Sequence, residues 1–269
     1  MKKILADIQQ IGANYKSIQS EFVFDSILQG NVSTNAYVDE KSDSTISMVW
    51  DMEQCIYFGG HSSNKEDYVE AVRFLKENIL DEDTRDKLSM IKIYYETDEW
   101  EDILLEELRN FNAQIYWRSL YAHNFDEIPE QINADKGLSI TNIDGQIIFS
   151  SKLANVHFLK KEIEKKWASK NRFVTHGFGY CAIKDKEILG WCTAEYLGNK
   201  TCGVGIQTVQ EFQRQGVASI LSEIFLKKCR EKGLVPYWDT WKKNISSLSC
   251  AEKIGFRKVT DYKVVLALL

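Results

Sequence analysis

The sequence predicts an α+β fold built on a mixed sheet, in a chain of two domains. Strand and helix patterns alternate through both halves of the 269 residues. Residues 206–218, IQTVQEFQRQGVA, predict a buried strand, a glycine-bearing turn and the start of an amphipathic helix. A polar segment with Pro129 links the halves near residues 125–136, so we place the domains at residues 1–130 and 131–269.

The N-terminal half opens with a helical region and then alternates strands with helices. Val69, Val72 and Leu75 recur at helical spacing, whereas Ile91 and Ile93 alternate with polar residues as in a strand. The expected elements are a helical region at 5–28, strands at 44–50 and 55–58, a helix at 65–79, a strand at 90–95, a helix at 98–110 and a strand at 113–121.

The C-terminal half, entered through residues 137–150, predicts the same order of elements. Val217, Ile220, Leu221 and Phe225 share one face of its long helix, and Gly233 ends that helix. The expected elements are a hairpin at 179–197 with its turn at 184–186, a strand at 202–208, the long helix, a strand at 235–241, a short helix at 246–254 before a glycine, and a strand at 261–268.

The turn before the long helix has the features of an anion site. The first N–H groups of a helix have no partner within the helix and lie at the positive end of its dipole. Gly216 removes the Cβ that would keep a phosphate at a distance, and Ala218 keeps the next turn small. Such a string is common on its own, but the strand before it and the amphipathic helix after it favour phosphate binding.

These motifs resemble those of the GCN5-related N-acetyltransferase (GNAT) superfamily. The matching residues are Gln213, Gly216 and Ala218 after a strand, and Asn244 with the Gly255-Phe256 pair between two later strands. The segments GFGYCAI, GIQTVQEFQRQGVAS, PYW and AEKIGF look like a bacterial group that includes zwittermicin-resistance acetyltransferases. The resemblance implies an acyl-CoA N-acyltransferase fold for the C-terminal domain and acetyl-CoA as cosubstrate, with no metal.

The resemblance also implies which residues hold acetyl-CoA. Its pantetheine arm would lie as a pseudo-strand against the end of the 202–208 strand, and its diphosphate on the N–H groups of the glycine turn. Asn244 either faces the cosubstrate or only caps a helix. The residues so assigned are Ile206, Gln207, Thr208, Gln213, Arg214, Gln215, Gly216, Val217, Ala218, Ser219 and Asn244.

Two departures from the superfamily pattern bear on mechanism. Many members have a tyrosine four residues before the glycine of the Gly-Phe pair, where this chain has Ala251. The narrower group often has a glutamate at the position of Gly203. Cys250 neighbours the vacant tyrosine position, and we interpret it as a small core residue because cysteine on a short helix usually is one.

The remaining acid–base candidates lie on strands. Glu195, on the second hairpin strand, is our first candidate for the general base, and Asp239 is our second. Tyr262 is a candidate acid for the leaving thiolate, although an aromatic residue in a half-buried strand is more often structural. We expect direct attack by the amine, since no paired nucleophile and base are evident.

The N-terminal half reads either as a degenerate copy of the same fold or as an unrelated α/β domain. Its elements follow the same order, but residues 59–67 lack the glycine turn. Glu66 and Asp67 would instead repel a diphosphate from the first helical turn. A degenerate copy would wall the substrate cleft without binding a cosubstrate, and both interpretations stay open.

Composition excludes several classes of function. The net charge of −5, a pI near 5.6 and 44% hydrophobic residues fit a soluble, cytoplasmic chain that does not bind nucleic acid. Charged and polar residues interrupt every apolar run, so we expect no membrane span. We expect the cysteines to be reduced core thiols rather than metal ligands or disulfides: Cys55, Cys181, Cys192, Cys202, Cys229 and Cys250.

The sequence therefore predicts transfer of acetyl from acetyl-CoA to a primary amine of a small molecule. An alternative is a catalytically silent acyl-CoA-binding module for sensing or assembly, which the missing tyrosine and glutamate favour slightly. Acetylation of protein lysines is a third option. Aromatic residues such as Trp191 and Trp238 would cradle an amine if they faced the cleft. The identity of the amine, the preferred acyl chain and the oligomeric state stay open.

Overall fold

A computed structural model describes residues 2–4, 8–39, 44–125, 137–150 and 152–269. Their contacts define two compact units. Unit 1 consists of Met1–Phe24, Ser33–Arg118 and Tyr262–Leu269, and unit 2 of Asp25–Val32 and Ser119–Asp261. The expected domain boundary at 130/131, and most of the expected link, lie outside the described residues. Within these ranges, no helix combines the length and apolar character needed to cross a membrane.

Unit 1 contains a mixed sheet with one parallel pair among antiparallel pairs. Strand β1 (Lys2–Ile4), β2 (Asn35–Val38), β3 (Ser47–Trp50) and β4 (Cys55–Gly59) pair antiparallel in order. Strand β5 (Met90–Tyr95) then pairs parallel to β4. The helical segments are η1 (Ile8–Asn14), α1 (Ile18–Leu28), α2 (Lys65–Asn78), α3 (Glu82–Lys87), α4 (Glu99–Glu107) and η2 (Arg109–Phe111).

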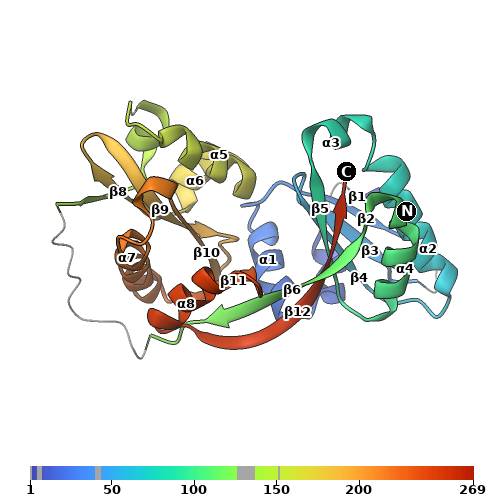
Figure 1. Cartoon of the computed structure of the whole chain (residues 1–269). Coiled ribbons are helices and arrows are strands. Elements are labelled where there is room, and N and C mark those ends of the chain that lie inside the picture. The colour runs from blue at the N-terminus through green and yellow to red at the C-terminus, as the bar shows by residue number, and fades with distance from the viewer. Residues whose placement is uncertain (1, 5–7, 40–43, 126–136, 151) are drawn as a thin grey trace. The chain divides into compact units, whose positions relative to one another are not determined.

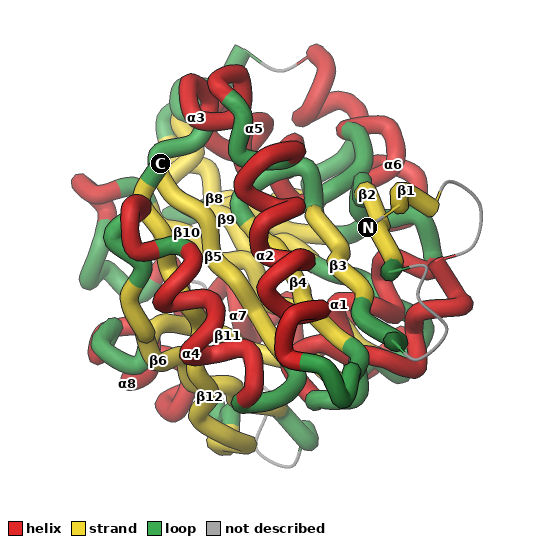
Figure 2. The backbone as a smooth tube through the Cα atoms, turned by 90° about the vertical axis from the view of Figure 1, so that its right-hand side faces the viewer, coloured by secondary structure: helices red, strands yellow, loops and turns green. Residues whose placement is uncertain are grey.

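Helices α2 and α4 cover one face of the unit 1 sheet and lie side by side over it (Figure 2). Both are amphipathic, so Leu75 of α2 and Trp100 of α4 are fully buried in the same apolar cluster. Asn64 caps α2 by accepting a hydrogen bond from the backbone N–H of Glu66 at 3.1 Å. A side chain of the protein itself thus accepts a hydrogen bond from a backbone N–H group at the N-terminus of α2.

Unit 2 has the same order of strands. Strands β7 (Ser139–Asn142), β8 (Gly179–Lys184), β9 (Glu187–Glu195) and β10 (Thr201–Thr208) pair antiparallel, and β11 (Val235–Trp241) pairs parallel to β10. The helical segments are η3 (Gln146–Ser150), α5 (Val156–Lys166), α6 (Lys170–His176), η4 (Gln210–Phe212), α7 (Val217–Lys232) and α8 (Ile245–Lys253). As α2 connects β4 to β5, α7 connects β10 to β11.

Two long strands contribute residues to both units. In β6 (Gln114–Ala122), residues 119–122 belong to unit 2, where this strand neighbours β11. In β12 (Arg257–Leu268), residues 262–268 belong to unit 1, where Val265 pairs with Ile93 of β5. Each unit therefore receives the end of a strand that begins in the other unit. The sequence predicted β12 only from residue 261.

Helices lie on both faces of the unit 2 sheet, with α5 and α6 on one side of β8 and β9 and α7 on the other (Figure 1). Cys202 of β10 faces α7, because its Sγ lies 3.7 Å from the Sγ of Cys229. Side chains alternate along a strand, so Gly203 and Gly205 lie on the face of α5. Apolar residues fill the α7 side, where Phe225 is fully buried.

Candidate active site

A pocket of about 580 Å³ lies within unit 2, at the N-termini of α7 and α8. It is large enough for part of an extended ligand. Its walls come from the end of β10, the turn before α7, one residue of β11 and helix α8. The lining residues are Ile206, Gln207, Thr208, Phe212, Gln213, Arg214, Gly216, Val217, Ala218, Ser219, Trp238, Asn244, Ser246, Ser247, Ser249, Cys250 and Lys253.

The pocket lies where two parallel strands stop pairing. The register of β10 and β11 runs from Thr201 opposite Val235 to Gly203 opposite Tyr237. Strand β10 continues to Thr208, still paired with β9 on its other side, and β11 continues to Trp241. The two strands therefore separate beyond Gly203 and leave backbone groups of 206–208 at the pocket. An extended amide-bearing ligand can pair with such an edge.

The N-terminus of α7 opens into the same pocket. Gly216 is its N-cap residue in the left-handed region, at φ 84°, and no described side chain caps the helix. The N–H of Ile220 donates to the Gly216 carbonyl at 3.2 Å, which closes the first turn. The N–H groups of Val217, Ala218 and Ser219 precede that bond. Backbone donors at the positive end of a 16-residue helix suit a phosphate.

The structure brings most of the predicted cofactor-binding residues together at this pocket. All of the predicted cofactor-binding residues line it except Gln215, whose side chain donates to the Glu211 carbonyl at 3.2 Å. Asn244 is the cap of α8, since its Oδ1 accepts from the N–H of Ser247 at 3.3 Å, and it also lines the pocket. The role of these residues toward a cosubstrate stays a prediction.

Helix α8 supplies pocket residues that sequence reasoning missed. Cys250, which we interpreted as a core residue, is half-buried and lines the pocket. Burial raises the pKa of its thiol, and the charge of Lys253, another lining residue, opposes that rise. Trp238 of β11 donates from Nε1 to Ser247 Oγ at 3.0 Å and so joins the strand to the helix. The serine-rich sequence at 246–249 was the available signal for this wall.

The first base candidate lies on the other face of the sheet. Glu195 pairs with Gly203 of β10, so its side chain shares the face of the two glycines and of α5. Its Oε2 lies 3.8 Å from Nζ of Lys166 on α5, and the exposed fraction of its side chain is 15%. Asp239 alternates with buried Trp238 on β11 and is half-buried. Neither carboxylate lines the pocket.

Tyr262, the candidate acid, lies in the part of β12 that belongs to unit 1. It is buried, with an exposed fraction of 8%, and its ring centroid lies 6.3 Å from that of Tyr94. These contacts describe its structural surroundings within unit 1, and its role as an acid stays a prediction. Trp191, one of the predicted cleft aromatics, is in the core at 1% exposure.

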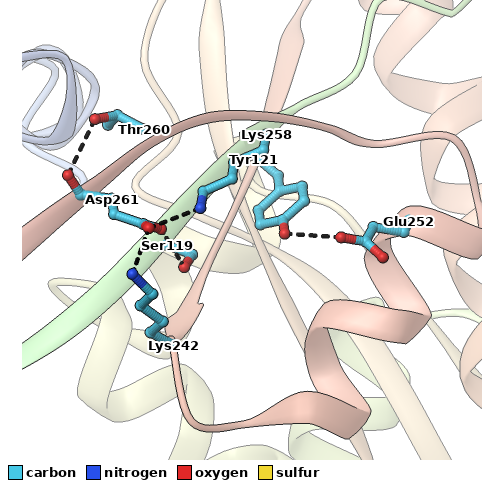
Figure 3. Close-up of polar contacts among 7 residues, drawn as sticks. All are labelled: Ser119, Tyr121, Lys242, Glu252, Lys258, Thr260 and Asp261. Atoms are coloured by element: carbon cyan, nitrogen blue, oxygen red, sulfur yellow. Dashed lines mark hydrogen bonds and ion pairs between the residues drawn. The ribbon is translucent and has the colours of Figure 1, made fainter.

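A polar cluster fastens the turn between β11 and α8 (Figure 3). Asp261 accepts hydrogen bonds from Ser119 at 2.6 Å, Lys258 at 2.7 Å and Lys242 at 2.8 Å. Partial burial alone would raise the pKa of Asp261, but these three donors hold it well below its usual range. Because Lys242 precedes Asn244 by two residues, the cluster holds the segment that places the α8 cap at the pocket.

A second contact in the same view ties α8 to β6 (Figure 3). The Tyr121 hydroxyl donates to Glu252 Oε1 at 2.9 Å. Burial and this bond raise the pKa of Tyr121 to about 12, so the phenol stays protonated at neutral pH. Glu252 neighbours Lys253 on α8, and the bond therefore fixes the helix that carries one wall of the pocket.

Comparison with known proteins identifies the class to which this fold and pocket belong. The profile of the GNAT acetyltransferases matches residues 14–265, and the chain belongs to this family of N-acetyltransferases. Membership implies an acyl-CoA cosubstrate and an acetyl acceptor.

Individual proteins similar to this chain are also N-acetyltransferases or have the same fold. The uncharacterized N-acetyltransferase YdfB of Bacillus subtilis is 26% identical over 243 residues, which cover 90% of this chain and 88% of the relative. A GCN5-related N-acetyltransferase-like protein from Streptococcus suis has the same fold, with a TM-score of 0.69, 14% identity and coverage of 97% and 98%. A tandem GNAT protein from the clavulanic acid biosynthesis pathway superposes with a TM-score of 0.59, 9% identity and coverage of 99% and 97%.

Proposed function

We propose that this N-acetyltransferase transfers the acetyl group of acetyl-CoA to a primary amine of a small molecule. The amine attacks the thioester directly. The observation that carries the proposal is the separation of β10 from β11 beyond Gly203, beside the uncapped start of α7. One pocket thus offers a strand edge for an extended thiol arm and backbone donors for a diphosphate.

Within this proposal, residues 206–208 pair with the pantetheine arm, and the N–H groups of 217–219 hold the diphosphate. Arg214 and Lys253 line the pocket and bring positive charge to the phosphates. The cosubstrate supplies an activated acyl group, and the chain supplies its position and the removal of a proton from the amine. Most of the rate acceleration then comes from orientation of the two substrates and from backbone donors at the thioester carbonyl.

Glu195 is the proposed general base, with Asp239 as the second candidate. The pocket is lined by the end of β10, the turn and first residues of α7, and α8, whereas Glu195 lies on the opposite face, beside the point where the strands separate. If the thioester of acetyl-CoA lies in the gap between β10 and β11, an amine that binds on the Glu195 face of the sheet can reach it. The half-buried Tyr237, Asp239 and Trp241 alternate with buried residues on β11 and add aromatic and acidic groups suited to an ammonium. Tyr262 is the proposed acid.

The similarity of the motifs to zwittermicin-resistance acetyltransferases supports an antibiotic or a related amine-bearing metabolite as the acceptor. Aromatic residues beside carboxylates recognise flat or cationic amines, which agrees with this choice of substrate class. Acetylation assays across a panel of such amines would test this substrate class.

We also infer that unit 1 is a degenerate copy of the acetyltransferase fold that binds no cosubstrate. Strand β4 pairs with β5 as far as Phe58 opposite Tyr95, the last residue of β5, so this parallel pair stays closed. Asn64 caps α2, and Glu66 and Asp67 stand in its first turn. These features oppose binding of a diphosphate there.

Thermal-shift titration with acetyl-CoA, followed by a thiol-release assay on a panel of amines, tests the proposed function. Acetyl-CoA at 100 times its dissociation constant should stabilise the folded chain by about 2.7 kcal/mol. Free thiol should then appear only when an accepted amine is added. Stabilisation by acetyl-CoA without release of free thiol in the presence of any amine would favour the silent acyl-CoA-binding module. Transfer of a labelled acetyl group from acetyl-CoA to added polypeptides would favour protein acetylation. No stabilisation at saturating acetyl-CoA would refute the proposal.

A further inference from the structure

Glycine at position 205 leaves space that the carboxylate of Glu195 fills. A Cβ built on Gly205 would lie 2.6 Å from Cδ and 2.7 Å from Cγ of Glu195, and closer still to Oε1. On Gly203, two residues earlier on the same face, a Cβ would lie 3.2 Å from the Glu195 carbonyl oxygen and 3.5 Å from its Cβ. Only at 205 does the absent side chain coincide with the carboxylate.

Helix α5 holds the other side of this carboxylate. Nζ of Lys166 lies 3.8 Å from Glu195 Oε2 and 3.4 Å from the hydroxyl of Tyr196, and 5.3 Å from the centre of the Tyr196 ring. The next residue, Trp167, donates from Nε1 to the carbonyl of Ala194 at 3.0 Å. Trp167 and Ala194 are the chain neighbours of Lys166 and Glu195. Their hydrogen bond therefore holds the backbone of α5 and the backbone of β9 together beside the ion pair.

We propose that Gly205 and Lys166 are positioning residues that hold the Glu195 carboxylate at the opening between β10 and β11. The inference rests on the proposed function, in which Glu195 is the base. The acceptor ammonium gives one proton to the carboxylate and attacks the thioester carbonyl as a neutral amine. The new C–N bond replaces the C–S bond, CoA leaves as its thiolate, and the second proton lost by the nitrogen passes to that sulfur. The carboxyl of Glu195 then releases its proton to water. Lys166 favours the ionised carboxylate before the acceptor enters, and Gly205 lets that carboxylate lie flat against β10.

Other titratable groups face the pair and define the controls. Tyr196 follows Glu195 on the chain and contacts Lys166, and Tyr237 and Asp239 share the same face of the sheet from β11. The Cys192 thiol lies on the opposite face of β9, where it pairs with Ile206, and its pKa is raised chiefly by burial, with the charge of Glu195 among the smaller causes. None of these groups is changed in the variants below, so a shift between variants reports the loss of the Lys166 charge.

The pH profile of kcat/KM for the full chain, in wild type and variants, tests the role of Lys166. Removing a cation at this distance should move the acidic limb of Lys166→Met toward higher pH by about one unit. Lys166→Arg should return the limb toward the wild-type position. Lys165→Met changes the exposed neighbour on the same helix and should leave the limb in place. An unmoved limb in Lys166→Met would overturn the role of this lysine.

Paired glycine variants test the other half of the proposal. In Gly205→Ala the new Cβ meets the end of a flexible side chain, so the chain should fold while the carboxylate moves away. We expect kcat to fall about 100-fold, with acetyl-CoA stabilisation unchanged. Gly203→Ala adds the same methyl group away from the carboxylate and should cost much less activity. Equal losses in the two variants would overturn the role of Gly205.

A measurement without acceptor separates this inference from the proposed function. The ¹³C carboxyl resonance of Glu195, assigned by its disappearance in Glu195→Gln, should titrate at higher pH in Lys166→Met than in wild type. The same midpoint in both proteins would contradict the inference. Full activity in Glu195→Gln, or no acetyl transfer to any amine, would instead contradict the assignment of the base or the proposed function itself.

Discussion

The two glycines at the ends of α7 provide a matched test of the phosphate site. Gly216 and Gly233 both have left-handed backbones, at φ 84° and 67°. An alanine at either position therefore costs about 1–2 kcal/mol of folding stability from the backbone alone. For a chain of this size, each kcal/mol lowers Tm by about 2–4 °C. The two variants should lose similar stability in the absence of ligand.

Only Gly216→Ala should weaken the binding of acetyl-CoA. Gly216 lines the pocket, whereas a Cβ on Gly233 would have no atom within 4 Å. Loss of one charge-assisted hydrogen bond to the diphosphate costs about 1.5–3 kcal/mol, which is at least a tenfold increase in Kd. At an acetyl-CoA concentration 100 times the wild-type Kd, ligand stabilisation should fall from about 2.7 to about 1.4 kcal/mol.

Thermal-shift titrations of the wild type and both variants measure these quantities together. Gly233→Ala should keep the full ligand-induced shift while showing the lower Tm without ligand. The same ligand-induced shift in Gly216→Ala as in Gly233→Ala would show that the glycine turn does not contact the cosubstrate.

Three further predictions test the pocket and its supports. Thiol reagents should modify Cys250 before the five buried cysteines, and the rate should increase as the pH rises toward the raised pKa of its thiol. Acetyl-CoA should protect Cys250 from modification. Rapid modification of a buried cysteine, or no protection by acetyl-CoA, would contradict the placement of Cys250 at the cosubstrate pocket. Asp261→Asn should lower the free energy of unfolding by about 1–3 kcal/mol at pH 7. Because the folded-state pKa of Asp261 is depressed, the difference from wild type should shrink as the pH falls below about 4, and a constant difference in urea unfolding would argue against the cluster. Leu75→Ala, in the fully buried core of unit 1, should cost about 2–5 kcal/mol in the same assay, against a small effect for exposed Lys87→Ala.

Local patterns in the sequence predicted most of the helices and strands. The 3.6-residue spacing of Val217, Ile220 and Leu221 and the stop at Gly233 defined α7 closely, and alternation defined β11 at its observed bounds. The four-residue strand β2 and the highly charged helix α3 were missed, because their short sequences carry little periodicity. Helix α8 begins at Ile245 rather than at the predicted 246, with Asn244 as its cap.

Non-local pairing explains what the sequence did not reveal. Nothing in the residues of β6 or β12 says which strand each will neighbour, so their passage from one unit to the other was not predicted. Candidate Glu195 came from its residue type and strand, but its contact with Lys166 joins residues 29 positions apart. The α8 wall with Cys250 and Lys253 was likewise missed, because a pocket formed by several elements has no local pattern.

A crystal structure with acetyl-CoA would show where the cosubstrate binds. Diphosphate oxygens should lie within hydrogen-bond distance of the N–H groups of 217–219. The pantetheine arm should lie along 206–208, and the thioester between β10 and β11, close to Gly205. A cosubstrate bound elsewhere in the chain, or a pocket that stays empty at saturating acetyl-CoA, would contradict this placement.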